Sequence, residues 1–436
     1  MKTRYLLMKN AIFRTAIVVI CAHFAGTADA QSKQTSVLQS AVLDSCYQWA
    51  RENYPLIKQL DLIDRSAAYS VNNAATGNLP QIGINAQATY QSDVTQFPIR
   101  LPNIDVPSIS KDQYKVYAEV YQPLSNFATV NTKKKELELQ ANIDQQKIEI
   151  DVYQLKDRVN QLFFGTILIE SNIKQLLITL VNVDSAMSVL TAAMANGTAT
   201  KTDQMLLQVE QLTLLQKMDE LTSNKKAFIK MLSLLTGKNI QQSTTFILPK
   251  YEPTPLSIER PELSLFKLQN QSLMLQSKQL NNRLLPTAGL FIQAGYGRPA
   301  LNFLDNDPSA YYIGGLKVGW NISNLYSYHN SKSALQLMSQ QLEYQEETFL
   351  LYTSLSQSQQ DSEMAKYEKV LESDEEIIRL RESVLEAAKV QLANGLITTI
   401  DYVKMLNALR TAREQYGLHQ IQLLQSQANL KTTTGN

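Results

Sequence analysis

Residues 81–91, with the sequence QIGINAQATYQ, alternate between polar or glycine positions and apolar positions over their whole length. This period of two is typical of a β-strand that has one apolar and one polar face. The pattern predicts a strand at about 81–92, after a helix-like segment that ends near Pro80. The apolar face of this strand consists of Ile82, Ile84, Ala86, Ala88 and Tyr90.

Three further segments have strand-like patterns. The sequence YKVYAEVYQ predicts a second strand at about 114–122, after a proline-rich loop at 97–110. In the other half of the chain, AGLFIQAGYG and YYIGGLKVGWNI predict strands at about 288–297 and 311–322. Aromatic residues surround these last two strands, namely Tyr296, Tyr311, Tyr312 and Trp320.

A much longer segment has the periodicity of a coiled coil. From Ile148 to Met194 the apolar residues alternate spacings of four and three, and only Thr166 interrupts them. This seam predicts a helix from about 128 to 195, which at 1.5 Å per residue is roughly 100 Å long. Apolar residues at intervals of seven follow in the stretch that starts at Leu207. We therefore expect antiparallel coiled-coil hairpins at about 126–237 and 326–434.

The tripeptide ANG stands at the expected turn of each hairpin, at 195–197 and 393–395. Glycine directly after a helix suits a left-handed cap, and the TD or TID that follows suits the start of a new helix. The two turns therefore form the tips of the hairpins, at the end of the molecule opposite the strands. The small polar residues at these tips are Asn196, Gly197, Thr198, Asn394 and Gly395.

The spacing of 198 residues between the two turns extends along much of the chain. Asp203 is matched by Asp401 at this spacing, and LSNF at 124–127 by ISNL at 322–325. Two copies of one structural unit therefore follow one another, at 31–237 and 259–436, with a linker at 238–258. The predicted fold class is mainly α with a small β part, built from a duplicated unit.

The first thirty residues have the character of a secretory signal. Basic residues precede the apolar run AIVVICAHFA, and ADA at 28–30 is a cleavage site of the A-x-A type. We expect residues 1–30 to be removed; translation starts at Met1 or Met8. Cys46 is then the one remaining cysteine, so no disulfide within the mature chain is expected.

Charge and hydropathy narrow the class of protein further. The formal charge of +1 gives no sign of a nucleic-acid partner. After residue 30 we expect no run of the ~20 apolar residues that a membrane-spanning helix requires. A part that enters a membrane is therefore expected to be made of strands. Four strands are too few to close a barrel, because the smallest membrane barrels have about eight. Several chains would have to combine their strands.

The chain resembles the TolC family of outer-membrane efflux and secretion channels over essentially all of its mature length. The resemblance rests on CYQWARENYPLIKQ near the start, NLP before the first strand, PLSNF before the long helix, and ANGLITTIDYVKMLNA at the second tip. It implies a homotrimer with a twelve-stranded barrel in the outer membrane and a tube of helices across the periplasm. The apolar strand positions from Ile82 to Tyr90 would then face lipid.

The resemblance also implies partners. A periplasmic adaptor protein and an inner-membrane transporter of the RND or ABC type would complete an efflux pump, in which this chain is the passive exit duct. The alternatives are the outer-membrane component of a type I protein secretion system and a structural coiled-coil protein of the periplasm. The cargo and the class of transporter are left open.

Asp401 has two interpretations. Members of the TolC family commonly close the periplasmic entrance with acidic residues just after the second tip, and Asp401 stands at the first such position. Lys404 stands where a second acidic residue would follow, which puts a double acidic ring in question. Alternatively, Asp401 only caps the returning helix, as Asp203 does in the first copy.

Other patterns do not support a chemical site. GYGRPA at 295–300 matches a dinucleotide fingerprint, but a hairpin loop follows it and the β-α-β surroundings are missing. His329 and His419, the histidines that remain after cleavage, belong to no ligand-spaced cluster. We therefore expect no catalytic residue, no metal and no cofactor, and we do not expect an enzyme.

Overall fold

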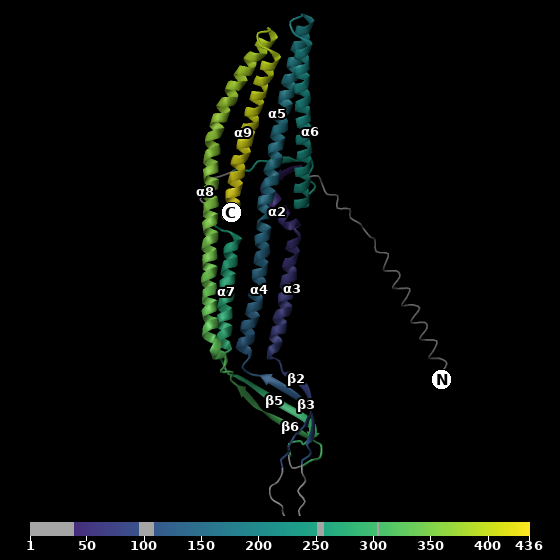
Figure 1. Cartoon of the computed structure of the whole chain (residues 1–436), viewed down its shortest axis with the longest axis vertical. Helices are drawn as coiled ribbons and strands as arrows, with labels where there is room; N and C mark the ends of the chain where they lie inside the picture. Colours follow the sequence, from purple (N-terminus) through teal and green to yellow (C-terminus); the bar gives the residue numbers. More distant parts are fainter. Residues whose placement is uncertain (1–38, 96–108, 251–256, 303–304) are drawn as a thin grey trace, which may run out of the picture.

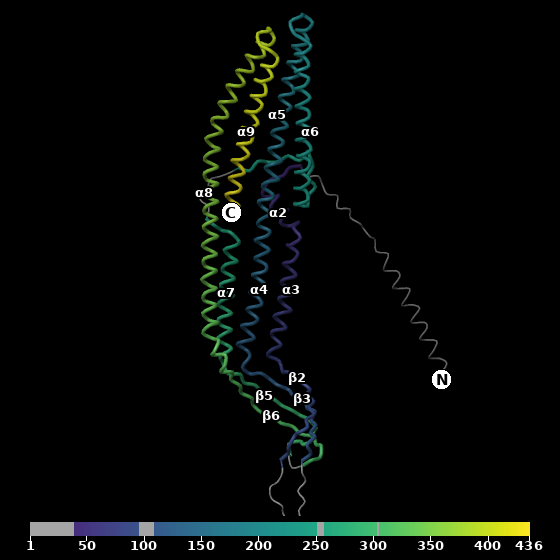
Figure 2. Tube along the Cα trace, viewed as in Figure 1, coloured from purple at the N-terminus to yellow at the C-terminus, as the bar shows by residue number. Residues whose placement is uncertain are grey.

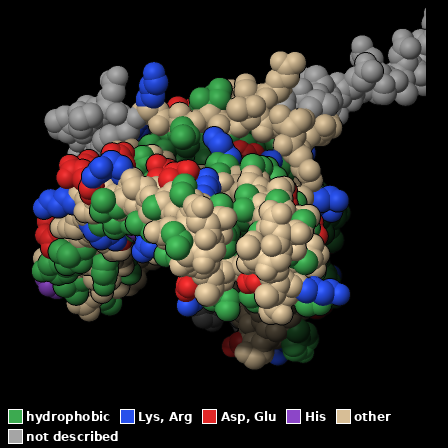
Figure 3. All heavy atoms as spheres, turned by 90° about the horizontal axis from the view of Figure 1, so that it is seen from above, with side chains coloured by type: hydrophobic (Ala, Val, Ile, Leu, Met, Phe, Trp, Pro, Cys, Tyr) green, Lys and Arg blue, Asp and Glu red, His purple; other side chains and the backbone are tan. Residues whose placement is uncertain are grey.

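The computed structural model describes residues 39–95, 109–250, 257–302 and 305–436. The expected signal peptide at 1–30 and most of the proline-rich loop lie outside these residues. The described chain is long and narrow, with the sheet at one end and two helical tips at the other (Figure 1). Viewed along the long axis from the tips, it is an arch that is hollowed on one side (Figure 3).

The chain of the first half runs to the sheet, then along the long helix to a tip, and then back toward the middle of the molecule. In chain order they are β1 (Ser40–Val42), α2 (Leu43–Asn53), η1 (Pro55–Lys58), α3 (Gln59–Ala75), η2 (Thr76–Asn78), β2 (Gln81–Tyr90), β3 (Asp112–Pro123), α4 (Phe127–Tyr153), α5 (Leu155–Ala195) and α6 (Lys201–Thr236).

The second half repeats the main part of this order. Its elements are β4 (Thr245–Ile247), α7 (Pro261–Asn282), β5 (Thr287–Arg298), β6 (Ser309–Gly319), α8 (Asn324–Ala393) and α9 (Thr399–Thr434). In both halves a helix runs toward the sheet and a strand hairpin follows. A long helix then leads to a tip, from which a shorter helix returns. The protein is thus mainly helical with a small sheet.

The long helix of the first half is interrupted, whereas a single unbroken helix was expected from 128 to 195. α4 ends at Tyr153 and α5 begins at Leu155, with Gln154 between them at φ −63° and ψ −17°. These angles tighten the backbone locally toward a 3₁₀ turn. The predicted apolar seam is still largely buried, for example at Val152, Val159 and Leu176.

The long helices have different neighbours in their two halves. Toward the sheet, α4 packs against α3 and α7, and α8 packs against α7. Toward the tips, α5 pairs with α6 and α8 pairs with α9 (Figures 1 and 2). The helical hairpins therefore occupy only the half of the molecule next to the tips, because the returning helices α6 and α9 end near the middle.

The buried core is divided into two clusters along the helices. One lies in the middle of the molecule and includes Cys46, Phe163, Leu232 and Ile421 from four helices. The other joins the two hairpins near the tips and includes Leu176, Leu207, Tyr402 and Leu406. Packing between α5 and α9 thus holds the two copies of the unit together.

The linker expected at 238–258 contains a strand. Thr245–Ile247 forms β4, which pairs in parallel with β1 at Ser40–Val42. Phe246 of this strand packs edge-on against Phe163, with ring centres 5.4 Å apart. Since β1 immediately precedes α2, the linker fixes the start of the described chain to the middle of the molecule.

One helical span, Phe127–Ala195, is long and apolar enough to cross a membrane by length and composition. Its most apolar window of 18 residues has a mean hydropathy of 1.6, and 28% of that window is buried within the chain. The sequence has no unbroken run of ~20 apolar residues after residue 30, but the mean hydropathy of this window is nevertheless high. The reason is a second set of apolar residues on the exposed side of the helix, among them Leu177 and Val181.

Candidate functional site

The sheet at one end of the molecule has four antiparallel strands in the order β2-β3-β5-β6. Its register places the apolar residues of neighbouring strands opposite one another. Ile84 pairs with Ala118, and Ala118 pairs with Ala294, which in turn pairs with Tyr312. Residues directly opposite one another lie on the same face of a sheet. All four strands therefore contribute to one continuous apolar face.

This apolar face is open. Ile82, Ile84 and Tyr90 are exposed by 76%, 80% and 79%, and Tyr312 is exposed by 80%. No helix of the described chain covers the sheet (Figure 1). An apolar face of this size on a soluble protein would have a second layer against it. The five residues predicted from the alternation, Ile82 to Tyr90 at every second position, all lie on this face.

The opposite face of the sheet is mainly polar. On β2 it carries Gln81, Asn85, Gln87 and Thr89, and the register continues it with Glu119 on β3 and Gln293 on β5. The two outer strands, β2 and β6, each have one strand neighbour in the described part of the chain. The sheet therefore has two free edges, one apolar face and one polar face.

The two tips lie together at the other end of the molecule (Figure 1). Gly197 and Gly395 both have φ +70°, in the left-handed region. At the first tip the Gly197 N–H donates to the Met194 carbonyl at 3.0 Å and the Thr198 N–H donates to the Ala193 carbonyl at 2.9 Å. The same pair of bonds recurs at Gly395 and Leu396. Each helix therefore ends in a Schellman motif, which requires a residue that tolerates positive φ.

Threonine, and not aspartate, is the N-cap of each returning helix. At α6 the Thr200 side chain accepts from the Asp203 N–H, and the Asp203 carboxylate accepts in return from the Thr200 N–H at 3.0 Å. At α9 the Thr398 side chain accepts from the Asp401 N–H at 3.2 Å. The sequence interpretation of Asp401 as a cap is therefore corrected in one respect: it is the third residue of the helix and binds to the cap.

The carboxylate of Asp401 has two neighbours. The Thr398 hydroxyl donates to it at 2.7 Å, and the Lys404 ammonium lies 3.7 Å from its other oxygen. The hydrogen bond from Thr398 is the main cause that lowers the pKa of Asp401 from its ordinary value, with a smaller contribution from Lys404. Both residues of the candidate gate thus lie on the first turns of α9, exposed and in contact with one another.

Asp203 lies near the start of the second returning helix. Its pKa is lowered mainly by the hydrogen bonds of Thr200, with a smaller contribution from the side chain of Thr399. Thr399 belongs to α9 and is buried. The first tip and the start of the second returning helix are therefore neighbours.

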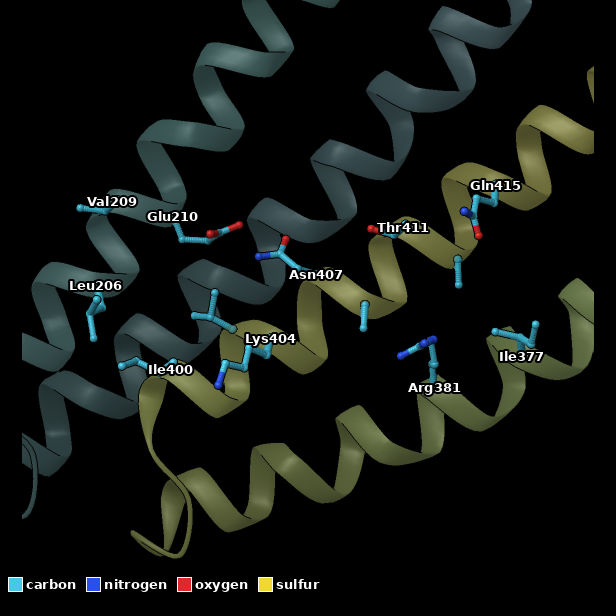
Figure 4. A pocket seen from close by; sticks show the side chains of 13 residues that line it. Leu206, Val209, Glu210, Ile377, Arg381, Ile400, Lys404, Asn407, Thr411 and Gln415 are labelled. Carbon is cyan, nitrogen blue, oxygen red and sulfur yellow. The ribbon is translucent and has the colours of Figure 1, made fainter.

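A groove of about 680 Å³ runs beside the tips between α6, α8 and α9 (Figure 4). Its apolar lining includes Leu206, Ile377 and Ile400. Arg381 of α8 and Lys404 of α9 extend along the same groove in Figure 4, opposite Glu210 of α6. Sequence periodicity did not indicate this groove, because it depends on how the two hairpins are placed beside one another.

The sequence did not indicate that His419 and Asp374 form a pair of ionisable residues. His419 Nδ1 lies 2.6 Å from Asp374 Oδ2 across the seam between α9 and α8, and Asp374 is only 8% exposed. The ring of Tyr367 stacks on His419 with centres 5.9 Å apart. Among the described residues, no group of three or more His, Cys, Asp and Glu side chains could hold a metal ion. His419 thus packs within the hairpin as a partner for a buried carboxylate.

Neither the known protein-family models nor the curated protein sequences include a match to this chain. Solved structures do match it. The outer membrane protein VceC of Vibrio cholerae has a TM-score of 0.65 and 13% identity, covering 90% of this chain and 96% of its own. The CmeC outer membrane channel of Campylobacter jejuni has a TM-score of 0.64 and 12% identity, covering 90% and 85%.

The open state of the MtrE outer membrane channel of Neisseria gonorrhoeae is similar to the same extent. Its TM-score is 0.65 at 13% identity, and the match covers 90% of this chain and 89% of MtrE. In each case the similarity covers 90% of this chain. The chain therefore has the fold of these outer-membrane channels, the TolC type of fold that its sequence motifs indicate.

Proposed function

We propose that this protein is the outer-membrane exit duct of a tripartite efflux pump and conducts substrates passively from the periplasm to the outside. The observation that carries this proposal is the uncovered four-stranded sheet, with its continuous apolar face and two free edges. In a membrane each unpaired backbone group at such an edge costs several kcal/mol. The edges must therefore be paired with strands of other chains.

A homotrimer satisfies this requirement. Three chains of four strands each give a closed barrel of twelve strands, in the size range of outer-membrane barrels. The face from Ile82 to Tyr90 then contacts lipid, and the polar face with Asn85 and Gln87 lines the pore. The arch that the helices form in one chain becomes one third of a tube (Figure 3).

The exposed apolar residues of the helices support the same assembly. Leu212 and Leu215 on α6 are exposed, as are Leu380 and Val384 on α8. These helices lie at the two outer sides of the pair of hairpins in Figure 1. In a closed ring, α6 of one chain would cover α8 of the next. The helical tube would then extend from the outer membrane into the periplasm.

The tips are the parts of this assembly that face the inner membrane. Asn196, Gly197, Thr198, Asn394 and Gly395 are small and polar, which allows the helical tips of a periplasmic adaptor to approach closely. The groove beside them presents apolar residues together with Arg381 and Lys404. The adaptor in turn would connect the duct to an inner-membrane transporter of the RND or ABC type. The three Asp401 residues of the trimer would surround the entrance.

A type I protein secretion system would use a duct of the same shape, and the sheet does not distinguish it from a pump. A structural coiled-coil protein of the periplasm is disfavoured, because such a protein would gain nothing from an uncovered apolar sheet. Neither proposal requires a catalytic group or a cofactor.

Native mass measurement of the full-length protein in detergent, together with planar-bilayer recording, tests the proposal. We expect a trimer that is extracted from the outer membrane only by detergent and that conducts ions. A monomer that is released without detergent would contradict the assignment. Deletion of the gene separates the two alternatives. Increased sensitivity of the cells to small toxic compounds would indicate a pump, whereas failure to secrete one particular protein would indicate type I secretion.

A further inference from the structure

The polar face of the sheet has an unusual distribution of glycine and aromatic residues. The register places six of the seven glycines of the four strands on this face, and Gly314 on the apolar face. The six are Gly83, Gly289, Gly295, Gly297, Gly315 and Gly319. The same face carries four aromatic residues, Tyr117, Tyr121, Phe291 and Tyr311.

Three of the four aromatic rings on the polar face lie against one of these glycines, and Tyr117 contacts one through its Cβ. Gly295 of β5 stands between Tyr117 of β3 and Tyr311 of β6, and pairs with both. A Cβ added to Gly295 would lie 2.6 Å from the Cβ of Tyr117 and 3.0 Å from the ring of Tyr311. No side chain other than hydrogen fits there, because the Tyr117 Cβ, the Tyr311 ring and the Val116 carbonyl oxygen, which is also 2.6 Å away, surround the position.

The second group of rings lies four residues further along the strands. Phe291 of β5 pairs with Tyr121 of β3 on one side and Gly315 of β6 on the other. A Cβ at Gly315 would lie 3.1 Å from the Phe291 ring, and one at Gly289 would overlap the Tyr121 hydroxyl. Both rings are therefore directed along the surface of the sheet and over glycines, and do not stand upright from it.

Exposure separates these rings from the aromatic residues of the apolar face. Tyr296 and Tyr312 on the apolar face are exposed by 57% and 80%, although they belong to the same strands. Tyr117, Tyr121, Phe291 and Tyr311 are all half-buried, with no second layer of the described chain above them. The surface that partly buries these rings is therefore the sheet itself. One face of the Tyr121, Phe291 and Tyr311 rings is thus held against the sheet, whereas the Lys115 ammonium lies 6.0 Å from the centre of the Tyr117 ring.

A carboxylate stands between the two groups of rings. Glu119 of β3 lies on the polar face two residues from both Tyr117 and Tyr121, and pairs with Gly83 and Gln293. Among the described residues it forms no ion pair, and the lysines of the same face, Lys115 and Lys317, lie beyond the rings on either side. The face of an aromatic ring attracts cations and stacks on other rings, so rings beside a carboxylate suit a cation that carries a ring of its own.

We propose that Tyr117, Tyr121, Phe291 and Tyr311, with Glu119, form a binding strip for organic cations that carry an aromatic ring. The ring of the solute stacks on the outward faces of the flat-lying side chains, and its positive charge lies near the Glu119 carboxylate. The strip itself is a property of the single chain; its position inside a pore rests on the proposed function. In a trimer the strip occurs three times around the lumen, and the flat rings bind solutes without narrowing the passage.

Photolabelling of the full chain in lipid vesicles tests this proposal. The probe is an azido derivative of phenyltrimethylammonium, and labelled peptides are identified by mass spectrometry. We expect labels on the segments around Tyr117, Tyr121, Phe291 and Tyr311. Unlabelled phenyltrimethylammonium should compete about 3- to 10-fold better than tetramethylammonium, which has the charge without the ring.

Two variants separate the contributions of rings and charge. Tyr117→Leu combined with Tyr311→Leu should reduce labelling about 3- to 10-fold, and Glu119→Gln should remove most of the preference for the cation over a neutral azidobenzene. The control is Tyr312→Leu, which removes a neighbouring ring on the apolar face and should leave labelling unchanged. If the double tyrosine variant does not insert into vesicles, Glu119→Gln alone decides, since it changes no packed residue.

Labelling that is spread evenly over the strands, or that Glu119→Gln and Tyr312→Leu change equally, would overturn the proposal. Labelling reports the strip whether or not the protein conducts ions. A protein that is labelled as expected but forms no conducting trimer would therefore contradict the proposed function and leave the strip in place. A conducting trimer without the expected labels would contradict the strip and leave the proposed function in place.

Discussion

Thr398 donates its hydroxyl to the Asp401 carboxylate at 2.7 Å, and Thr200 makes the same bond to Asp203 at 2.6 Å, 198 residues earlier. Both pairs open a returning helix directly after a glycine turn. The two tips are thus built alike down to single hydrogen bonds. They differ in their surroundings, since Thr399 of the second copy contributes to the lowered pKa of Asp203, whereas Asp401 has Lys404 of its own helix beside it.

The first prediction concerns Asp401→Ala. The hydrogen bond from Thr398 lowers the pKa of Asp401 in the folded state, so the ionised carboxylate stabilises the start of α9 above its unfolded pKa of 3.8. That contribution is lost as the pH falls through the lower, folded pKa. We expect faster amide hydrogen exchange over residues 399–402 in Asp401→Ala at pH 7, and little difference from the unaltered protein once the pH is below both pKa values.

Asp401→Ala also tests the entrance gate. If three Asp401 carboxylates surround the mouth, the variant should show weaker cation preference and weaker block by multivalent cations in a planar bilayer. Lys404→Ala is the matched control, because it removes a charge at the same level without removing the bond to the cap. Unchanged selectivity with faster exchange would assign Asp401 to the helix cap alone.

The second prediction concerns the tip glycines. Gly395 has φ +70° and no atom within 4 Å of an added Cβ, so valine would fit in space but not in backbone conformation. Gly395→Val should cost roughly 1–2 kcal/mol at the tip and loosen the turn. We expect normal trimer and membrane levels but increased sensitivity of cells to the substrates of the pump.

Gly395→Asn is the matched control, since asparagine tolerates the left-handed region better than valine. It should retain most of the activity. Equal loss of resistance in both variants would show that the tip requires the absence of a side chain, for example for contact with the adaptor, and not the turn conformation.

The third prediction concerns the two faces of β2. Ala86 pairs with Val116 on the apolar face, and its neighbour Gln87 pairs with Lys115 on the polar face. Ala86→Arg should impair insertion into the outer membrane by about 2–4 kcal/mol if the residue lies near the middle of the bilayer. Gln87→Arg should insert normally and change only conductance. Membrane levels measured after fractionation of cells compare the two, and equal behaviour would contradict the assignment of the faces.

The fourth prediction uses Cys46 as a probe of folding. This cysteine is fully buried between α2 and its neighbours, and burial raises the pKa of its thiol to about 12. Since the thiolate is the reactive form, the folded protein should not react with a maleimide at neutral pH, whereas the denatured protein should react completely. Rapid labelling of the native trimer would show that the middle cluster opens readily.

The sequence by itself determined the elements and their order. Strict alternation from Gln81 to Tyr90 identified a strand with one apolar face, and the seam through Val152, Val159 and Leu176 identified the long helix. The ANG turns were recognisable because glycine is favoured where φ is positive, and the repeat of 198 residues showed the duplication. These features depend on residues that are close in sequence, so their signals are local.

The tertiary structure decided how those elements combine. It brought β3 beside β5, which placed Tyr117 and Tyr311 on either side of Gly295. It also set α6 beside α9, which created the groove at Lys404 and placed Thr399 near Asp203. It also broke the long helix at Gln154 and gave Asp374 its partner His419. In most of these cases, packing brings together residues that are far apart in the sequence. At Gln154, packing sets the backbone angles. No periodic pattern within one segment records them, because the free energy that selects them comes from contacts between segments.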